Sequence, residues 1–175
     1  MNLYLIGYRG SGKSTVAPIV AEMLGRPWVD ADDRVEERAE KSIADIFASE
    51  GEAHFRDLEA AVVSELASDR EQVISLGGGA PMFERNRTQL TGSGKTVFLT
   101  AEIDVLWKRI SGDQSTANRR PGLTDLDGRA EIETLLAKRN PVYKACADYT
   151  IAVDDLSPEE VAQQIVNWWS NVDRD

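Results

Sequence analysis

The chain has 175 residues, of which 42% are hydrophobic and 29% charged, as expected of a folded protein with its own core. Its formal net charge of −10 disfavours binding to nucleic acid or to anionic membranes, so an anionic ligand needs a local cluster of basic side chains. A lone cysteine, Cys146, rules out an internal disulfide and fits a reducing compartment. The first apolar run is too short for a signal peptide or a membrane span. A cytoplasmic monomer is expected.

Short apolar runs alternate with amphipathic segments along the whole chain. Apolar residues recur at helical spacing over 16–24 and 58–66, and Ser42 with Asp45 resembles a helix start. Alternating strands and helices imply right-handed crossovers, hence a parallel sheet with helices on both faces, in one α/β domain over residues 1–175. The strand candidates are Leu3–Ile6, Trp28–Val29, Val73–Leu76, Val97–Leu99 and Thr150–Val153.

A complete phosphate-binding loop lies between the first strand candidate and the first helical segment. Residues 7–14 read Gly-Tyr-Arg-Gly-Ser-Gly-Lys-Ser and match G-x-x-x-x-G-K-[ST]. Its glycines let backbone N–H groups turn inward around phosphates, at the positive end of the following helix. Lys13 is expected to reach the β- and γ-phosphates of ATP, and the Ser14 hydroxyl to ligate Mg²⁺. The predicted ATP site comprises Gly10, Ser11, Gly12, Lys13, Ser14 and Thr15.

A second run, residues 92–96, reads Gly-Ser-Gly-Lys-Thr and resembles part of this motif. Gln89 occupies the position of the first glycine, and the run precedes a strand candidate instead of following one. It is therefore predicted to be a turn.

The kind of nucleotide enzyme follows from what accompanies the phosphate loop. The chain has no N-K-x-D run to read guanine, and it is short for a motor or a transport ATPase. The polar segment 111–127 carries Arg119 and Arg120. It is either a solvated loop or a lid that closes arginines onto phosphates. A small-molecule kinase with a lid over 111–127 is the favoured interpretation.

Two further segments are candidates for the acceptor site. Asp30 and Asp32 stand two residues apart at the end of the second strand candidate, so strand alternation would point them the same way, at the edge of the sheet where ligands bind. Alternatively, they are a polar strand end that caps the next helix. Residues 75–80 read Ser-Leu-Gly-Gly-Gly-Ala. Three glycines cost backbone entropy and indicate close approach to a ligand, or else an ordinary tight turn.

Together with the phosphate loop, several motifs resemble the shikimate kinases in order and spacing, from Leu3 to about Trp168. The resemblance implies the fold of nucleoside monophosphate kinases: a five-stranded parallel sheet in the order 2-3-1-4-5 with helices on both faces, an acceptor-binding region at about 31–60, and a lid. The motifs are Asp30-Ala-Asp32, His54-Phe55-Arg56, residues 75–80, Arg120-Pro121 and residues 137–143, which read Ala-Lys-Arg-Asn-Pro-Val-Tyr.

The resemblance also implies roles for individual residues on the acceptor side. Asp32 would bind the hydroxyls of shikimate, including the one that attacks. Arg56 and Arg139 would bind its carboxylate, whose two oxygens suit a planar guanidinium. Backbone N–H groups of Gly78 and Gly79 would lie beside the same ligand. Each arginine could instead be a surface residue of a helix.

On the nucleotide side, the resemblance implies that Asp30 steadies Mg²⁺ through water, that Arg109 flanks the adenine and that Arg120 contacts ATP as the lid closes. Arg109 could equally be a surface arginine. Arg119 could share or take the role of Arg120, because the chain reads Arg-Pro-Gly-Leu at 120–123 where the family commonly has Arg-Pro-Leu-Leu.

The activity implied is direct transfer of the γ-phosphoryl group of ATP to the 3-hydroxyl of shikimate, on the route to the aromatic amino acids. The products would be shikimate 3-phosphate and ADP, the catalytic residues Lys13, Asp32 and Arg120, and the cofactor Mg²⁺. Positioning and charge neutralisation dominate such a transfer, and Asp32 would accept the hydroxyl proton late. Two alternatives stay open: a kinase for another hydroxy acid such as gluconate, and a nucleotide-binding module without catalysis.

Overall fold

A five-stranded parallel sheet is the centre of the computed structural model, which describes residues 1–112 and 128–172. The strand order is β2-β3-β1-β4-β5, and every neighbouring pair is parallel. Both features confirm the predicted sheet. The strands are β1 (Asn2–Ile6), β2 (Trp28–Asp30), β3 (Val73–Ser75), β4 (Gly94–Thr100) and β5 (Tyr149–Ala152).

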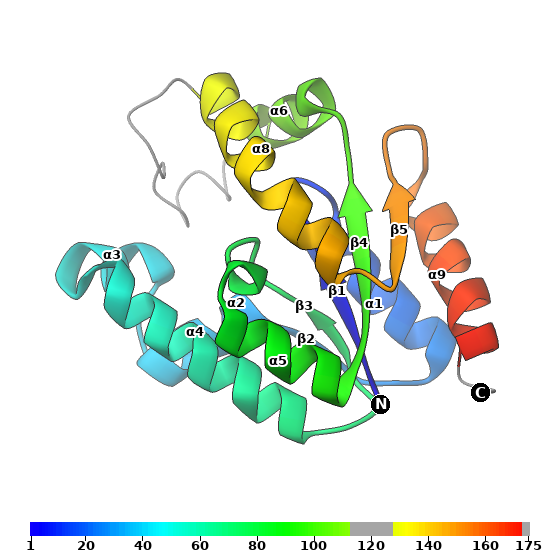
Figure 1. The fold of residues 1–175 in the computed structure, drawn as a ribbon, viewed down its shortest axis with the longest axis horizontal. Coiled ribbons are helices and arrows are strands. Elements are labelled where there is room, and N and C mark those ends of the chain that lie inside the picture. The colour runs from blue at the N-terminus through cyan, green and yellow to red at the C-terminus, as the bar shows by residue number, and fades with distance from the viewer. Residues whose placement is uncertain (113–127, 173–175) are drawn as a thin grey trace.

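Helices connect successive strands and cover both faces of the sheet (Figure 1). The predicted helix start at Ser42 is confirmed, because its Oγ accepts a hydrogen bond from the Asp45 backbone N at 3.1 Å. The described helices are α1 (Lys13–Leu24), α2 (Ala31–Ala39), α3 (Ile43–Ser49), α4 (Gly51–Ser68), the 3-10 turn η1 (Ala80–Met82), α5 (Glu84–Ser93), α6 (Ile103–Gly112), α8 (Gly128–Cys146) and α9 (Pro158–Val172).

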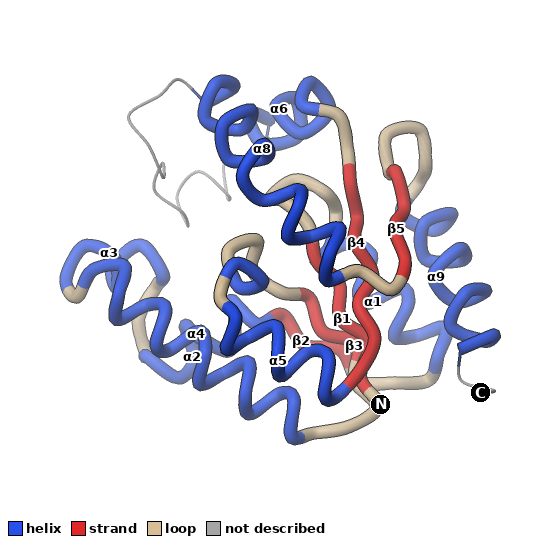
Figure 2. The backbone as a smooth tube through the Cα atoms, in the orientation of Figure 1, coloured by secondary structure: helices blue, strands red, loops and turns tan. Residues whose placement is uncertain are grey.

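The core lies on both faces of the sheet, because alternate side chains of each strand point in opposite directions. Leu3 and Leu5 of β1 pack with α1 and α9. Tyr4 and Ile6 of the same strand pack with α4, α5 and α8. Figure 2 shows the strands between these two groups of helices. Strands that are covered on both faces, such as β1, consist of continuous apolar runs, and such runs can be recognised in the sequence.

The run at residues 92–96 is not the turn that the sequence predicted. α5 ends at Ser93 and β4 begins at Gly94, with no loop between them. A side chain on Gly94 would collide with the backbone of Asn2 in β1. Lys95 forms an exposed ion pair with Asp148 at 3.0 Å. Close packing of two strands, not phosphate binding, therefore explains the glycine and lysine of this run.

The lid prediction cannot be placed on the fold, because residues 113–127 lie outside the described residues, and Ser111 and Gly112 end α6. Among the helices of the described residues, none combines the length and apolarity needed to cross a membrane.

Candidate active site

The predicted functional segments meet at the edge of the sheet where three neighbouring strands end. The phosphate loop, residues 7–14, follows β1, and the triple glycine, residues 77–79, follows β3. Leu5 of β1 and Asp30 of β2 both pair with Ser75 of β3. The loops that continue these strands therefore lie side by side. This carboxyl edge is where ligands bind to open parallel sheets.

The larger of two adjoining clefts, the P-loop cleft, runs along the phosphate loop and the start of α1. Residues 9–16 line it, so it contains every residue of the phosphate loop that was predicted to bind ATP. Gly10 and Gly12 have φ of 81° and 93°, a left-handed conformation that glycine adopts without steric cost. Such turns point backbone N–H groups inward and form anion-binding concavities.

Lys13 is buried in this cleft at 7% exposure. Its Nζ donates hydrogen bonds to the carbonyl oxygens of Gly7 at 2.8 Å and Tyr8 at 3.0 Å. The ammonium group is thus folded onto the loop that carries it, within the cleft lined by the phosphate-loop residues. Whether it reaches the β- and γ-phosphates of ATP stays a prediction.

The next residue, Ser14, lies against Asp30. Its hydroxyl donates to Asp30 Oδ2 at 2.6 Å. Residues 1–112 and 128–172 contain no group of three or more His, Cys, Asp or Glu able to hold a metal ion. Mg²⁺ usually takes one or two protein oxygens and completes its shell with water and substrate phosphates, so this hydroxyl and carboxylate fit a magnesium site shared with a nucleotide.

The prediction that Asp30 and Asp32 face the same way along one strand is wrong. β2 ends at Asp30, and Asp32 lies in the first turn of α2. Asp30 Oδ1 accepts a hydrogen bond from the Asp32 backbone N at 3.0 Å, so Asp30 caps the helix, and the chain turns before alternation can apply. Both carboxylates still line the P-loop cleft, and Asp32 also lines the second cleft.

Arg109 of α6 closes the far end of the P-loop cleft and is not a free surface arginine. Its guanidinium donates to the carbonyl oxygens of Gly10 at 3.3 Å and Val153 at 3.1 Å. This end of the cleft is apolar apart from the arginine, and its side chains are Ile110, Val153, Leu156, Pro158 and Val161.

The second cleft, the glycine cleft, is lined by residues 77–79 and holds every residue predicted for the acceptor: Asp32, Arg56, Gly78, Gly79 and Arg139. A Cβ on Gly77 would lie 2.5 Å from Asp32 Oδ1, and a Cβ on Gly79 would lie 2.5 Å from Arg56 Nη1. The glycines are therefore required so that a carboxylate and a guanidinium can approach the backbone. A tight turn alone would not need them.

Arg56 is held rigidly in the glycine cleft by two acidic residues of its own helix, α4. Nη1 donates to both carboxylate oxygens of Glu59 at 3.2 and 3.1 Å, and Nη2 donates to Glu52 at 3.0 Å. The guanidinium also lies 5.0 and 5.3 Å from the ring centroids of Phe55 and Phe83. Burial raises the pKa of Glu59, and the charge of Arg56 opposes this shift. Arg56 is a positioned cation, not a solvated one.

Arg139 of α8 supplies a second cation to the glycine cleft. Its guanidinium lies 5.6 Å from the ring centroid of Tyr8. Burial raises the pKa of Tyr8, and the charges of Arg9 and Arg139 oppose this shift. Tyr143, one turn further along α8, donates its hydroxyl to the Gly78 carbonyl at 2.5 Å. That hydrogen bond fixes α8, and Arg139 with it, against the triple glycine.

Two charged residues of the site were not predicted from the sequence, and two predicted residues are not among those that the structure describes. Arg119 and Arg120 lie outside the described residues. Glu59 and Arg9 both line the glycine cleft but were not predicted from the sequence. Glu59 carried a usable signal, because it interrupts the apolar stripe of α4 at helical spacing between Phe55 and the residues 62–66. Arg9 occupies a variable position of the phosphate-loop motif and carried none.

The family comparison agrees with this geometry. A family model described as "Shikimate kinase" matches residues 9–170. A shikimate kinase of Rhodopirellula baltica is 45% identical over 165 residues, which cover 94% of this chain and 88% of that protein.

Two solved structures are similar to this chain to different degrees. The structure of a shikimate kinase from Acinetobacter baumannii in complex with shikimate superposes with a TM-score of 0.90 at 34% identity, covering 97% of this chain and 93% of that one. A gluconokinase from Sinorhizobium meliloti shares only the fold, with 19% identity and a TM-score of 0.60 over 98% of this chain and 92% of that one.

Proposed function

This chain belongs to the shikimate kinase family, and we propose that it transfers the γ-phosphoryl group of ATP to the 3-hydroxyl of shikimate. The observation that carries the proposal is the position of Asp32, which lies where the P-loop cleft meets the glycine cleft. A nucleotide in one cleft and a hydroxy acid in the other would bring the γ-phosphate and the attacking hydroxyl together beside this carboxylate.

On the nucleotide side, the backbone N–H groups of residues 10–15 bind the phosphates, and Lys13 turns its ammonium from the loop carbonyls onto the γ-phosphate. Arg109 and the apolar residues near it enclose the adenine. Ser14 would hold Mg²⁺ through its hydroxyl, and Asp30 would hold it through water. When bound, Mg²⁺ offsets negative charge on the β- and γ-phosphates. Arg120 adds a cation from the lid.

On the acceptor side, Arg56 and Arg139 bind the shikimate carboxylate, and Gly78 and Gly79 offer backbone N–H groups beside it. Asp32 binds the hydroxyls, including the one that attacks. The pair Arg56–Glu59 supports this assignment because it presents a fixed guanidinium of low exposure, 12%, and a preorganised cation binds a carboxylate at low entropic cost.

The phosphoryl group passes directly from ATP to the acceptor, without a covalent bond to the protein. The 3-oxygen of shikimate forms a bond to the γ-phosphorus as the bond from that phosphorus to the β–γ bridging oxygen breaks, which releases ADP. The hydroxyl proton passes to Asp32 late in the transfer. The transition state is loose, so alignment by the two clefts and neutralisation by Lys13 and Arg120 supply most of the acceleration.

We also propose the organisation of the chain around this reaction. Residues 1–175 act as one kinase domain and as a cytoplasmic monomer, with an acceptor-binding region at about 31–60 and a lid at about 111–127. The described part of the first region supports this, because α2, α3 and α4 contribute Asp32, Phe47 and Arg56 to the glycine cleft.

The experiment that tests the proposal is turnover with MgATP against a panel of acceptors. Formation of ADP and of a phosphorylated product would be measured for shikimate, for gluconate and for a shikimate analogue without the carboxylate. We expect kcat/KM for shikimate to exceed that for either competitor by at least about 100-fold. The analogue would leave both arginines unpaired, and the open chain of gluconate would not hold its hydroxyls in place beside Asp32. Faster use of gluconate would overturn the assignment, and ATP binding without turnover of any acceptor would indicate a binding module.

A substitution in the triple glycine tests how the acceptor cation is held. Gly79→Ala should lower kcat/KM for shikimate about 10-fold, because the new methyl group displaces Arg56 and loses a charged hydrogen bond. Gly79 has φ of −87°, so the backbone itself tolerates alanine. Gly92→Ala is the matched control, since a Cβ there meets nothing within 4 Å. Steady-state kinetics with both variants decide the point, and equal activities would show that Arg56 need not be where the structure places it.

A further inference from the structure

Arg9, in the variable part of the phosphate loop, lies at the junction of the two clefts. Arg9 and Asp32 are the residues that line both the P-loop cleft and the glycine cleft. Among the described cations, Lys13 and Arg109 line only the first, and Arg56 and Arg139 line only the second. The junction within the described residues therefore combines one carboxylate with one guanidinium.

The backbone on either side of Arg9 is fixed. Tyr8 is 2% exposed and packs with residues of α6 and α8 such as Leu106 and Ile132. Gly10 has φ of 81°, and a Cβ on it would lie 3.0 Å from the side chain of Ile110. The backbone position of Arg9 is thus set by its neighbours.

The guanidinium of Arg9 is held by an ion pair with Glu131 but keeps N–H donors that have no partner among the described residues. Its Nη2 donates to Glu131 Oε1 at 2.9 Å, and the two side chains are 14% and 3% exposed. Its Nε is buried and has no hydrogen-bond partner among the described residues. Because Arg9 lines both clefts and uses only one of its N–H donors on Glu131, a ligand oxygen at the junction that accepts from the guanidinium would bind favourably.

The proposed reaction creates such an oxygen at this place. Transfer moves the phosphoryl group from the nucleotide to the hydroxyl beside Asp32, so the new phosphate dianion lies next to a carboxylate. Once Asp32 has released the proton that it accepted from the hydroxyl, these two negative charges repel strongly where solvent is scarce. Arg56 and Arg139 are occupied by the acceptor carboxylate in the same proposal, and Lys13 lines the P-loop cleft alone, so Arg9 is the described cation that can offset the new charge from the acceptor side as well.

We propose that Arg9 binds the phosphoryl group after its transfer, and so selects the phosphorylated product over the unphosphorylated acceptor. The inference rests on the proposed function, because it takes shikimate 3-phosphate as the product. It assigns to a variable position of the phosphate loop a contact on the acceptor side of the reaction, in addition to the nucleotide contacts of the loop backbone.

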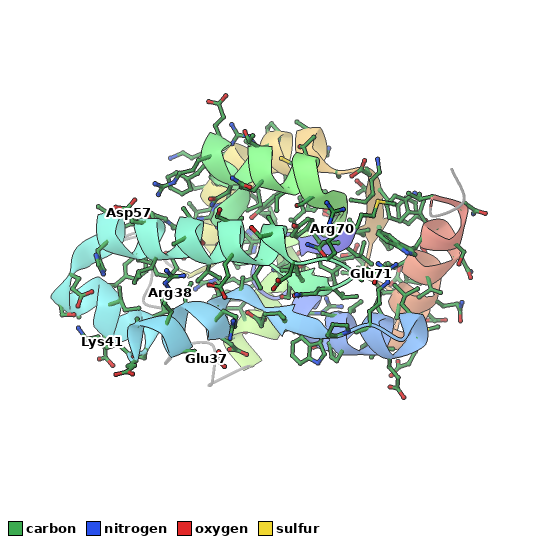
Figure 3. The ribbon with its side chains drawn as sticks, turned by 90° about the horizontal axis from the view of Figure 1, so that it is seen from below. Glu37, Arg38, Lys41, Asp57, Arg70 and Glu71 are labelled. Atoms are coloured by element: carbon green, nitrogen blue, oxygen red, sulfur yellow. The ribbon has the colours of Figure 1, made fainter. Side chains whose placement is uncertain are left out.

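Dissociation constants for shikimate and for shikimate 3-phosphate, measured by calorimetry on the full chain, test this inference. Arg9→Met should weaken binding of the phosphorylated product about 10-fold or more, the effect of losing a hydrogen bond to a charged group, and should change shikimate binding less than about 3-fold. Arg38→Met is the matched control. Arg38 belongs to α2, and its side chain extends toward α4 (Figure 3), where it pairs with Glu65 at 3.0 Å. It lines neither cleft. It loses the same charge and should change neither constant.

Arg9→Met leaves the buried Glu131 without the charge of Arg9, so the double variant Arg9→Met/Glu131→Gln is included in case the single variant does not fold. It should show the same selective loss of product affinity. Equal weakening of both ligands, or unchanged product binding in a folded variant, would overturn the role of Arg9. Failure of the parent protein to phosphorylate shikimate would instead overturn the proposed function, which separates the two outcomes.

Discussion

Lys13→Ala should lower kcat about 100- to 1000-fold while the chain stays folded, because removing one preorganised donor to a developing charge has an effect of this size. The ammonium now donates to the carbonyls of Gly7 and Tyr8, and in the reaction it would turn to the γ-phosphate. Its contribution is therefore electrostatic, and the core loses no large apolar group. Circular dichroism and a coupled kinase assay measure the two parts of the prediction.

The chain contains its own control for this experiment. Lys95 also follows a Gly-Ser-Gly run, but it lies on β4 in an exposed ion pair with Asp148. Lys95→Ala should leave kcat unchanged and alter stability by less than about 1 kcal/mol, as is usual for exposed pairs. Near-normal activity of a folded Lys13→Ala protein would remove the phosphate-loop argument. Equal losses in both variants would point to a general effect of lost positive charge.

The fold was predictable from the sequence largely because its central strands, β1, β3 and β4, are buried on both faces. Runs such as Leu3–Ile6 and Val97–Leu99 are apolar without interruption, and their alternation with amphipathic segments allows little besides parallel crossovers. The extension of β4 back to Gly94 was not predictable in this way. Glycine and lysine have low intrinsic β-propensity, so Gly94 and Lys95 belong to the strand because they pair with β1.

The site was predictable where a motif carries the chemistry, and less so where tertiary packing does. The position of Asp32 followed from its motif, but its conformation depends on the cap formed by Asp30. Glu59 belongs to the glycine cleft only because α4 turns it onto Arg56 beneath the triple glycine. Arg9 depends still more on context, since its partner Glu131 is 122 positions away in the sequence. No local pattern reports a contact of that kind.

The second large effect is expected on the recognition of the acceptor carboxylate. Arg139→Ala should weaken the binding of shikimate about 10- to 100-fold, because it removes a hydrogen bond to a charged group worth about 1.5–3 kcal/mol. The affinity for ATP should stay nearly unchanged. Arg139 is the cleaner of the two cations to remove, because it stacks on the ring of Tyr8, whereas Arg56 neutralises the buried Glu59.

Arg56→Ala alone would confound recognition with stability. Removing one partner of a buried ion pair typically destabilises a protein by about 3–5 kcal/mol, and Glu59 is 3% exposed. The variant is therefore best made as Arg56→Ala/Glu59→Gln, which removes both charges, and compared with Glu59→Gln alone. The additional loss in the double variant then reports on the guanidinium, and it should again be about 10-fold or more for shikimate.

An acceptor analogue without the carboxylate separates recognition from general damage to the cleft. The parent protein should use this analogue poorly, and neither Arg139→Ala nor the Arg56 double variant should reduce its use much further, because the contact they remove is already missing. KM and kcat for shikimate and for the analogue, measured on each variant at saturating MgATP, provide the comparison. If the variants penalise the analogue as heavily as shikimate, the two arginines shape the cleft without reading the carboxylate. Selection of the acceptor would then depend on Asp32 and the glycine backbone.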